Sequence, residues 1–147
     1  MLRNSRERLL AMADGLSTEQ WNAIPEGFVN NIAWNIGHLV STQQGICYRR
    51  AGVPVLISED FLERYKPESK PEGPVSEAEI EEIKRLFQTL PDRLMEDINN
   101  GIFENYVAWT NRYGVVMNNI SEAMTLVLFH EGLHFGYVMA LKRALQR

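Results

Sequence analysis

An apolar stretch close to the C-terminus restricts how this chain can fold. Residues 126–141, LVLFHEGLHFGYVMAL, contain one charged side chain and no proline, and they predict an apolar helix. His130 and His134 lie four residues apart in it, so both imidazoles leave the same face of the helix, one turn apart. Burying two neutral imidazoles is costly unless their nitrogens find partners. A shared metal ion is the simplest partner.

The third and last histidine, His38, lies in an earlier helical stretch, residues 28–48, that has no Asp, Glu, Lys or Arg. An exposed helix face normally carries charges, so its uncharged face predicts a polar pocket. The residues that share this face with His38 are Asn31, Asn35, Thr42 and Gly45. A lone histidine is more often a hydrogen-bonded core residue than a ligand, but the pair and the polar face together favour a divalent metal site.

Three imidazoles with an open fourth position are the arrangement of catalytic zinc sites, in which the metal activates a water or a thiol. We therefore predict that His38, His130 and His134 bind one divalent ion. Imidazole suits zinc, nickel, copper and iron(II) alike, and of these we expect zinc or nickel.

Two neighbours of the histidines are candidates for further roles. Asn35, one turn before His38, is expected to bond the second nitrogen of that imidazole or a bound water; the alternative is an ordinary polar residue at a helix contact. Glu131 lies within a turn of both C-terminal histidines. It is a candidate general base, a fourth ligand, a partner for a ligand from another helix, or a rim carboxylate that faces solvent.

Residues 130–134 also read as H-E-x-x-H, the motif of zinc proteases in which the Glu is the general base. The context disfavours a protease, because the tail FGYVMALKRALQR contains no His, Asp or Glu for a third ligand downstream of the motif. Thirteen residues are too few for the second half of a protease domain.

Helical periodicity dominates the rest of the sequence. The first expected helix runs from Leu2 to near Gly15, and the second from about Phe28 to Arg50. The third begins at a Ser76/Glu79 capping box, with a kink or break at Pro91. The fourth runs from an Asn119 cap to Leu145. Four principal helices and almost no strand predict an all-α helical bundle.

We expect local structure in the segments that connect these helices. Ser17 and Gln20 resemble a capping box for a short helical turn. Residues 52–75 are rich in proline and form a long connection between the second and third helices, with about one helical turn at Asp60–Tyr65. Residues 103–117 favour a short hairpin around Asn111–Gly114.

Composition restricts the class of protein. The 147 residues predict one domain, 1–147, with a core that needs no disulfide. A net charge of −4 and a pI of about 5.4 disfavour nucleic acid and anionic membranes as partners. Cys47 is the single cysteine, which fits a reducing cytoplasm, and we expect a cytoplasmic protein with no signal peptide and no membrane span.

The motifs together resemble those of the DinB superfamily, the DinB/YfiT-like metalloenzymes. The resemblance rests on W-N-I-G-H at residues 34–38, a long connection, and H-E-G-L-H-F-G-Y at residues 130–137, and it extends over nearly the whole chain. It implies a four-helix bundle of up-down-down-up topology, a divalent metal on His38, His130 and His134, and frequently a homodimer.

Similar proteins include thiol-dependent S-transferases, a thiol-dependent isomerase and metal-dependent hydrolases, which implies a small-molecule substrate and, for the transferases, a low-molecular-weight thiol. Metal coordination converts a thiol of pKa about 8.5 to a thiolate at neutral pH. Candidate walls of a substrate pocket are Trp34, Trp109, Arg112 and Tyr137. Two classes stay open: a metal-dependent transferase or hydrolase with an open coordination position, and a non-catalytic metal-binding or stress-related bundle in which Glu131 closes the site.

Overall fold

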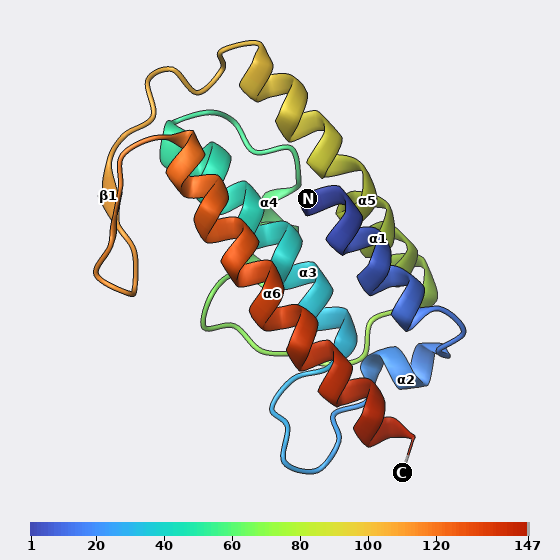
Figure 1. Ribbon diagram of the computed structural model, residues 1–147. Helices are drawn as coiled ribbons and strands as arrows, with labels where there is room; N and C mark the ends of the chain where they lie inside the picture. The colour runs from blue at the N-terminus through green and yellow to red at the C-terminus, as the bar shows by residue number, and fades with distance from the viewer. Residues whose placement is uncertain (147) are drawn as a thin grey trace.

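The computed structural model describes residues 1–146, which form a helical bundle. Its principal helices are α1 (Leu2–Ala13), α3 (Ile32–Gln43), α5 (Glu77–Asn99) and α6 (Ile120–Leu145). α3 packs against α5 and α6, and α1 packs against the same two helices, so the four surround one core. Figure 1 shows α1 and α6 running in one direction and α3 and α5 in the other. The predicted all-α bundle is confirmed.

Short elements connect these helices. α2 (Thr18–Asn22) follows α1, and α4 (Glu59–Arg64) lies in the long connection before α5. Both predicted capping boxes are present, because the Ser17 and Ser76 side chains accept from the backbone N–H three residues on and receive the reciprocal bond. The predicted hairpin forms from β1 (Trp109–Thr110) and β2 (Val116–Met117), which pair antiparallel before α6.

The second helix begins later than its sequence predicts. The Asn31 side chain accepts from the Trp34 N–H and caps α3, so the expected start at Phe28 is wrong. After Gln43 the chain continues as a π-helical turn, η1 (Gln44–Tyr48), and a 3₁₀ turn, η2 (Arg49–Ala51). It ends at Gly52, whose φ of +70° favours glycine.

A kink or a break is predicted at Pro91, and of the two the break is wrong, because α5 continues through the proline. Proline has no N–H, so the Phe87 carbonyl one turn earlier loses its helical donor. The Arg6 guanidinium supplies a replacement and donates from Nη1 to Phe87 O at 3.2 Å. A side chain from α1 therefore compensates for a proline in α5.

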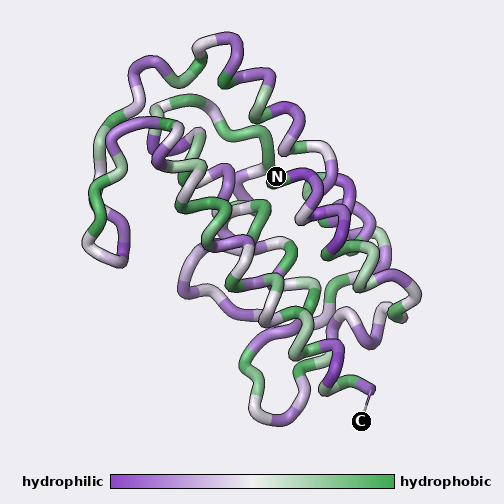
Figure 2. The backbone as a smooth tube through the Cα atoms, viewed as in Figure 1, coloured by the Kyte–Doolittle hydropathy of each residue, from purple (hydrophilic) through white to green (hydrophobic). Residues whose placement is uncertain are grey.

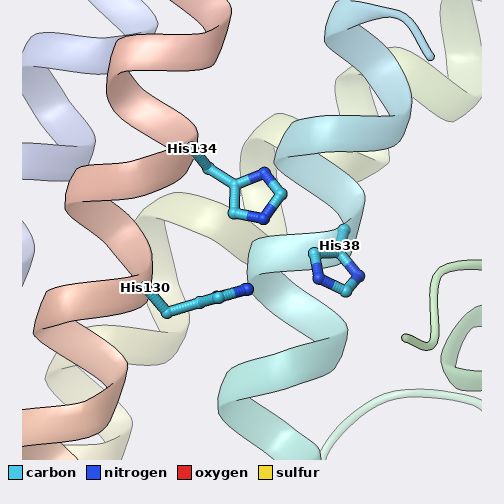
Figure 3. Close-up of side chains that lie close together, drawn as sticks. All are labelled: His38, His130 and His134. Atoms are coloured by element: carbon cyan, nitrogen blue, oxygen red, sulfur yellow. The ribbon is translucent and has the colours of Figure 1, made fainter. Parts of the chain in front are cut away.

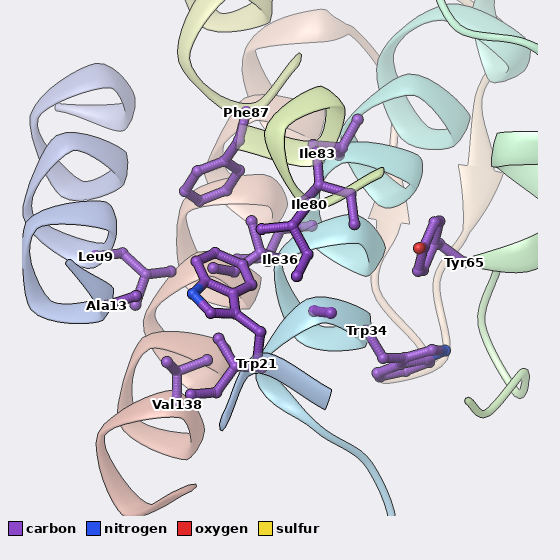
Figure 4. Packing of buried hydrophobic residues seen from close by; sticks show 14 of the residues in the cluster. Leu9, Ala13, Trp21, Trp34, Ile36, Tyr65, Ile80, Ile83, Phe87 and Val138 are labelled. Carbon is purple, nitrogen blue, oxygen red and sulfur yellow. The ribbon is translucent and has the colours of Figure 1, made fainter. Parts of the chain in front are cut away.

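Most of the buried residues are apolar. Apolar and polar residues alternate along the principal helices, as expected for amphipathic helices around one core (Figure 2). In the larger cluster Trp21 of α2 packs beside residues of α1, α3, α5 and α6 (Figure 4). Cluster members that Figure 4 labels include Leu9, Ala13, Ile36, Ile80, Phe87 and Val138.

An ion pair between Arg6 and Glu131 lies inside this bundle. Both residues are buried, with 1% and 4% of their surface exposed. Arg6 donates to Glu131 Oε1 from Nε at 3.0 Å and from Nη2 at 2.6 Å, and to Leu39 O at 3.4 Å. Its guanidinium also lies 4.4 Å from the centre of the Phe87 ring. One side chain of α1 thus contacts α3, α5 and α6.

α6 is both long and apolar. By length and composition alone it could cross a membrane, with a mean hydropathy of 1.2 over its most apolar window, of which 22% is buried. This is weak evidence for a membrane span, because core helices of soluble proteins have a similar length and composition. The absence of a membrane partner stays a prediction.

We expect Arg6→Met and Glu131→Leu each to lower the free energy of unfolding by about 3–5 kcal/mol, because each leaves one buried charge without its partner. The double variant should be much less destabilised than the sum of the two. Urea denaturation measures all three, with Arg3→Met as the matched control, since the Arg3–Glu7 pair on the same helix is exposed. Additive losses in the double variant would contradict a coupled ion pair.

Candidate metal centre

The fold brings the three histidines together between two helices. His38 comes from α3, and His130 and His134 come from α6. One ring nitrogen of each lies within 4.8 Å of those of the other two. The ring centres are 5.1 Å apart for His38 and His130, 4.9 Å for His38 and His134, and 4.5 Å for the i, i+4 pair. Figure 3 shows His130 and His134 pointing from α6 towards α3, where the His38 ring lies.

A backbone carbonyl orients His38. Its Nδ1 lies 2.7 Å from Tyr65 O, and because a carbonyl only accepts, Nδ1 carries the proton and Nε2 keeps its lone pair. Tyr65 packs directly on Gly37, where an added Cβ would lie 2.7 Å from the tyrosine ring. The glycine before His38 therefore allows the approach that brings Tyr65 O to the imidazole. The Trp34 ring stacks on the His38 ring, with the two ring centres 4.6 Å apart.

Asn35 orients His134. The Asn35 amide donates to Asn30 Oδ1 at 2.8 Å and to Asn31 O at 2.7 Å, which leaves its oxygen to accept from His134 Nδ1 at 2.7 Å. The lone pair of His134 is then on Nε2. The expected supporting role of Asn35 thus has a partner, but it is His134 and not His38, because α6 crosses α3 beside Asn35.

Burial favours the neutral form of all three imidazoles. Burial lowers the pKa of His130 to about 3. Positive charge on His134, His38 and Arg112 would act in the same direction. Burial and then His38 lower the pKa of His134 to about 4. Burial also lowers the pKa of His38, against the opposing bond to Tyr65 O. Neutral imidazoles with available lone pairs are the form that binds a metal.

The histidines fit a divalent ion. Tetrahedral zinc with nitrogens at about 2.0–2.1 Å places its ligand atoms roughly 3.3 Å from one another, and the observed nitrogens lie within 4.8 Å. Two of the three rings already carry their proton on the nitrogen that bonds Tyr65 O or Asn35, as in metal sites whose ligands are oriented by outer hydrogen bonds.

Glu131 points away from this site. Of the alternatives left open for Glu131, the solvent-facing rim carboxylate is wrong, because the residue is buried and its carboxylate bonds Arg6. Burial raises the pKa of its carboxyl, and the Arg6 guanidinium opposes that shift. The cluster of potential metal ligands among residues 1–146 consists of the three histidines and includes no carboxylate. Nothing in these contacts supports Glu131 as a ligand or as a base.

A cavity of about 740 Å³ opens beside the histidines, and all three line it. Trp34, Trp109 and Arg112 lie in its wall, as predicted, and so do Thr42 and Gly45 from the polar face of α3. Tyr137 does not line it, because its ring packs edge-on against Phe28 at 5.5 Å. The volume is that of a site for a small molecule.

Comparison with known families decides the classification. The family model described as DinB superfamily matches residues 1–138. The chain belongs to the DinB superfamily. No match is found among curated proteins. Family membership and the three-histidine cluster fit a metal-binding DinB protein.

Sequence reasoning missed two groups that hold the site of this DinB protein together. Arg6 lies on the same face of α1 as Leu2 and Leu9. A charged residue in an apolar stripe indicates a buried partner, so this position in the sequence contained the information. The Tyr65 carbonyl had no such signal, because a backbone acceptor is present at every residue. Glu131 interrupts the buried apolar stripe of α6, between Val127 and Val138. The two histidines of α6 lie beside this stripe, towards α3.

In this DinB protein we expect Asn35→Leu to weaken zinc binding by about 10–100-fold, because His134 loses the acceptor that fixes its ring and its proton. Competition with a chromophoric chelator measures the affinity. Asn22→Leu is the control, since Asn22 bonds the backbone of Thr18 and Val75, outside the histidine site. Equal affinities of the two variants would contradict the role assigned to Asn35.

Proposed function

We propose that this chain is a metal-dependent enzyme that acts on a small molecule, by transfer of a low-molecular-weight thiol to an electrophile or by hydrolysis. The observation that carries the proposal is the position of the histidines. Three neutral imidazoles from two helices line a cavity of about 740 Å³, and no carboxylate or thiol completes their cluster among residues 1–146. A site with three protein ligands and an adjoining cavity is typical of catalytic metals.

The chain's own residues would hold and shield the reacting groups. A divalent ion, zinc or nickel, would supply Lewis acidity and lower the pKa of a thiol or water bound to it. Tyr65 O and the Asn35 side chain fix two of the ligands, so little reorganisation is needed when the ion binds. Trp34, anchored by a bond from its indole N–H to Ser69 Oγ at 3.0 Å, forms an apolar wall beside His38.

The alternative, a non-catalytic bundle with a closed metal site, requires a fourth protein ligand. Glu131 was the candidate for that position, and its carboxylate is instead bonded to Arg6. The open cavity on the histidines therefore favours the enzyme over the closed site. We assign Glu131 a structural role and no part in proton transfer.

A screen of the zinc- and nickel-loaded protein tests the proposal. Pairs of thiols and aromatic halides test transfer, and activated esters test hydrolysis. We expect turnover above the rate in solution with at least one class, and its loss in His38→Ala and His134→Ala. Tyr137→Phe, on the same helix as His134 but outside the cavity, should retain it. Turnover that persists in both histidine variants would reject a histidine-bound metal as the catalyst.

We further infer that two copies of the chain associate through α6. Phe129, Leu133 and Met139 are about half exposed on this helix, and an added Cβ at Gly132 or Gly136 would meet nothing within 4 Å. This face carries small and apolar residues, which allow two helices to approach closely. The proposal also includes a location in the cytoplasm, in keeping with the single buried cysteine, Cys47.

Light scattering should give a mass near twice 16.9 kDa, and Leu133→Glu should shift it to that of one chain, because a charge on the uncharged face opposes burial. Glu7→Gln, exposed on α1, is the control. A wild-type mass near 16.9 kDa would reject the dimer.

A further inference from the structure

The cavity beside the histidines differs in charge from the rest of the chain. The whole protein has a net charge of −4, whereas the charged residues of the cavity wall are mostly basic. They are Arg49, Arg50, Lys66 and Arg112, against Glu63 and Glu68. A concave site lined by one sign of charge attracts ligands of the opposite sign. The wall therefore favours an anionic ligand.

Two of the four cations already have partners. Arg49 pairs with Glu59, and Lys66 pairs with Glu63 at 2.6 Å. Arg50 and Arg112 form no ion pair within residues 1–146. Their guanidinium groups are the ones available to a ligand in this cavity.

Arg50 is held against an aromatic wall. Its guanidinium lies 4.5 Å from the centre of the Trp109 ring. Trp109 in turn donates from its indole N–H to Tyr106 Oη at 2.8 Å, and Tyr106 Oη donates to Ile46 O at 2.8 Å. This series of hydrogen bonds fixes the indole relative to η1, so Arg50 and Trp109 form a preset corner of the cavity.

Arg112 lies in the hairpin, between β1 and β2. The turn is stiff, because the buried Asn111 accepts at Oδ1 from the backbone N–H of Tyr113 at 2.9 Å and of Val115 at 3.1 Å. Arg112 and the three histidines line the same cavity. The hairpin thus places a cation next to the proposed reaction centre.

We propose that Arg50 and Arg112 form an oxyanion-binding subsite that holds a carboxylate or phosphate of the substrate, with the apolar body of the molecule against Trp34 and Trp109. The planar guanidinium fork matches either oxyanion with two parallel hydrogen bonds. This inference rests on the proposed function, because it names the substrate class of the same site. Arg50 and Arg112 would be specificity-determining residues.

Calorimetric titration with three probes of similar shape tests the subsite: benzoate, phenyl phosphate and the neutral benzamide. Each is titrated into the zinc-loaded protein and into the chelator-treated protein. We expect both anions, or the one that the substrate carries, to bind at least about 10-fold more tightly than benzamide in both preparations. Higher salt should weaken the anions and leave benzamide unchanged.

Arg50→Gln and Arg112→Gln should each reduce that preference about 10-fold, whereas Arg8→Gln, exposed on α1, should keep it. Arg112→Lys keeps the charge without the fork, and should retain part of the preference. Equal affinities for benzoate, phenyl phosphate and benzamide would overturn the subsite, as would an anion preference unchanged in both glutamine variants. The chelator-treated protein reports anion binding in the absence of metal. An anion preference in a protein that shows no turnover would therefore support the subsite and reject the proposed reaction.

Discussion

The buried pair of Arg6 and Glu131 sets the rotation of α6, and the clustering of the three histidines depends on that rotation. Successive helical residues are about 100° apart around the axis, so with Glu131 directed to α1, His130 and His134 lie about 100° and 60° to one side of it. That side faces α3, where His38 lies. Arg6 also bonds Leu39 O, next to His38 in the chain. If α6 turned about its axis, Glu131 would lose contact with Arg6, and His130 and His134 would move away from His38. The same interaction therefore stabilises both the core and the histidine cluster.

Local patterns predicted most of the fold. The capping side chains of Ser17, Ser76 and Asn119 act within three residues, and the hairpin depends on a turn of five residues, so their sequences contain the information that forms them. The failed prediction of a break at Pro91 arises because a distant residue decides. α5 continues through Pro91 because Arg6 bonds the carbonyl that the proline leaves without a donor, and no pattern within α5 reports that contact.

The candidate site divides in the same way. The i, i+4 spacing of His130 and His134 and the uncharged face around His38 follow from helical geometry, and the cluster of three is observed. Which neighbour bonds which imidazole depends on how α3, α4 and α6 cross, so Asn35 was assigned to the wrong histidine and Tyr65 was not foreseen. The prediction for Glu131 failed because residues beside it in the sequence are candidate ligands, whereas its own side chain leaves the helix towards α1.

The central claim is that His38, His130 and His134 together bind a divalent ion. Metal content by mass spectrometry on tag-free protein tests it most directly, with the wild type compared with His38→Ala, the variant that removes the only ligand from α3. We expect close to one zinc or nickel ion per chain in the wild type and its loss in the variant, with the helical content of both unchanged. No bound metal in the wild type, even after zinc and nickel are added, would contradict the account and reduce the three histidines to residues of a helix contact.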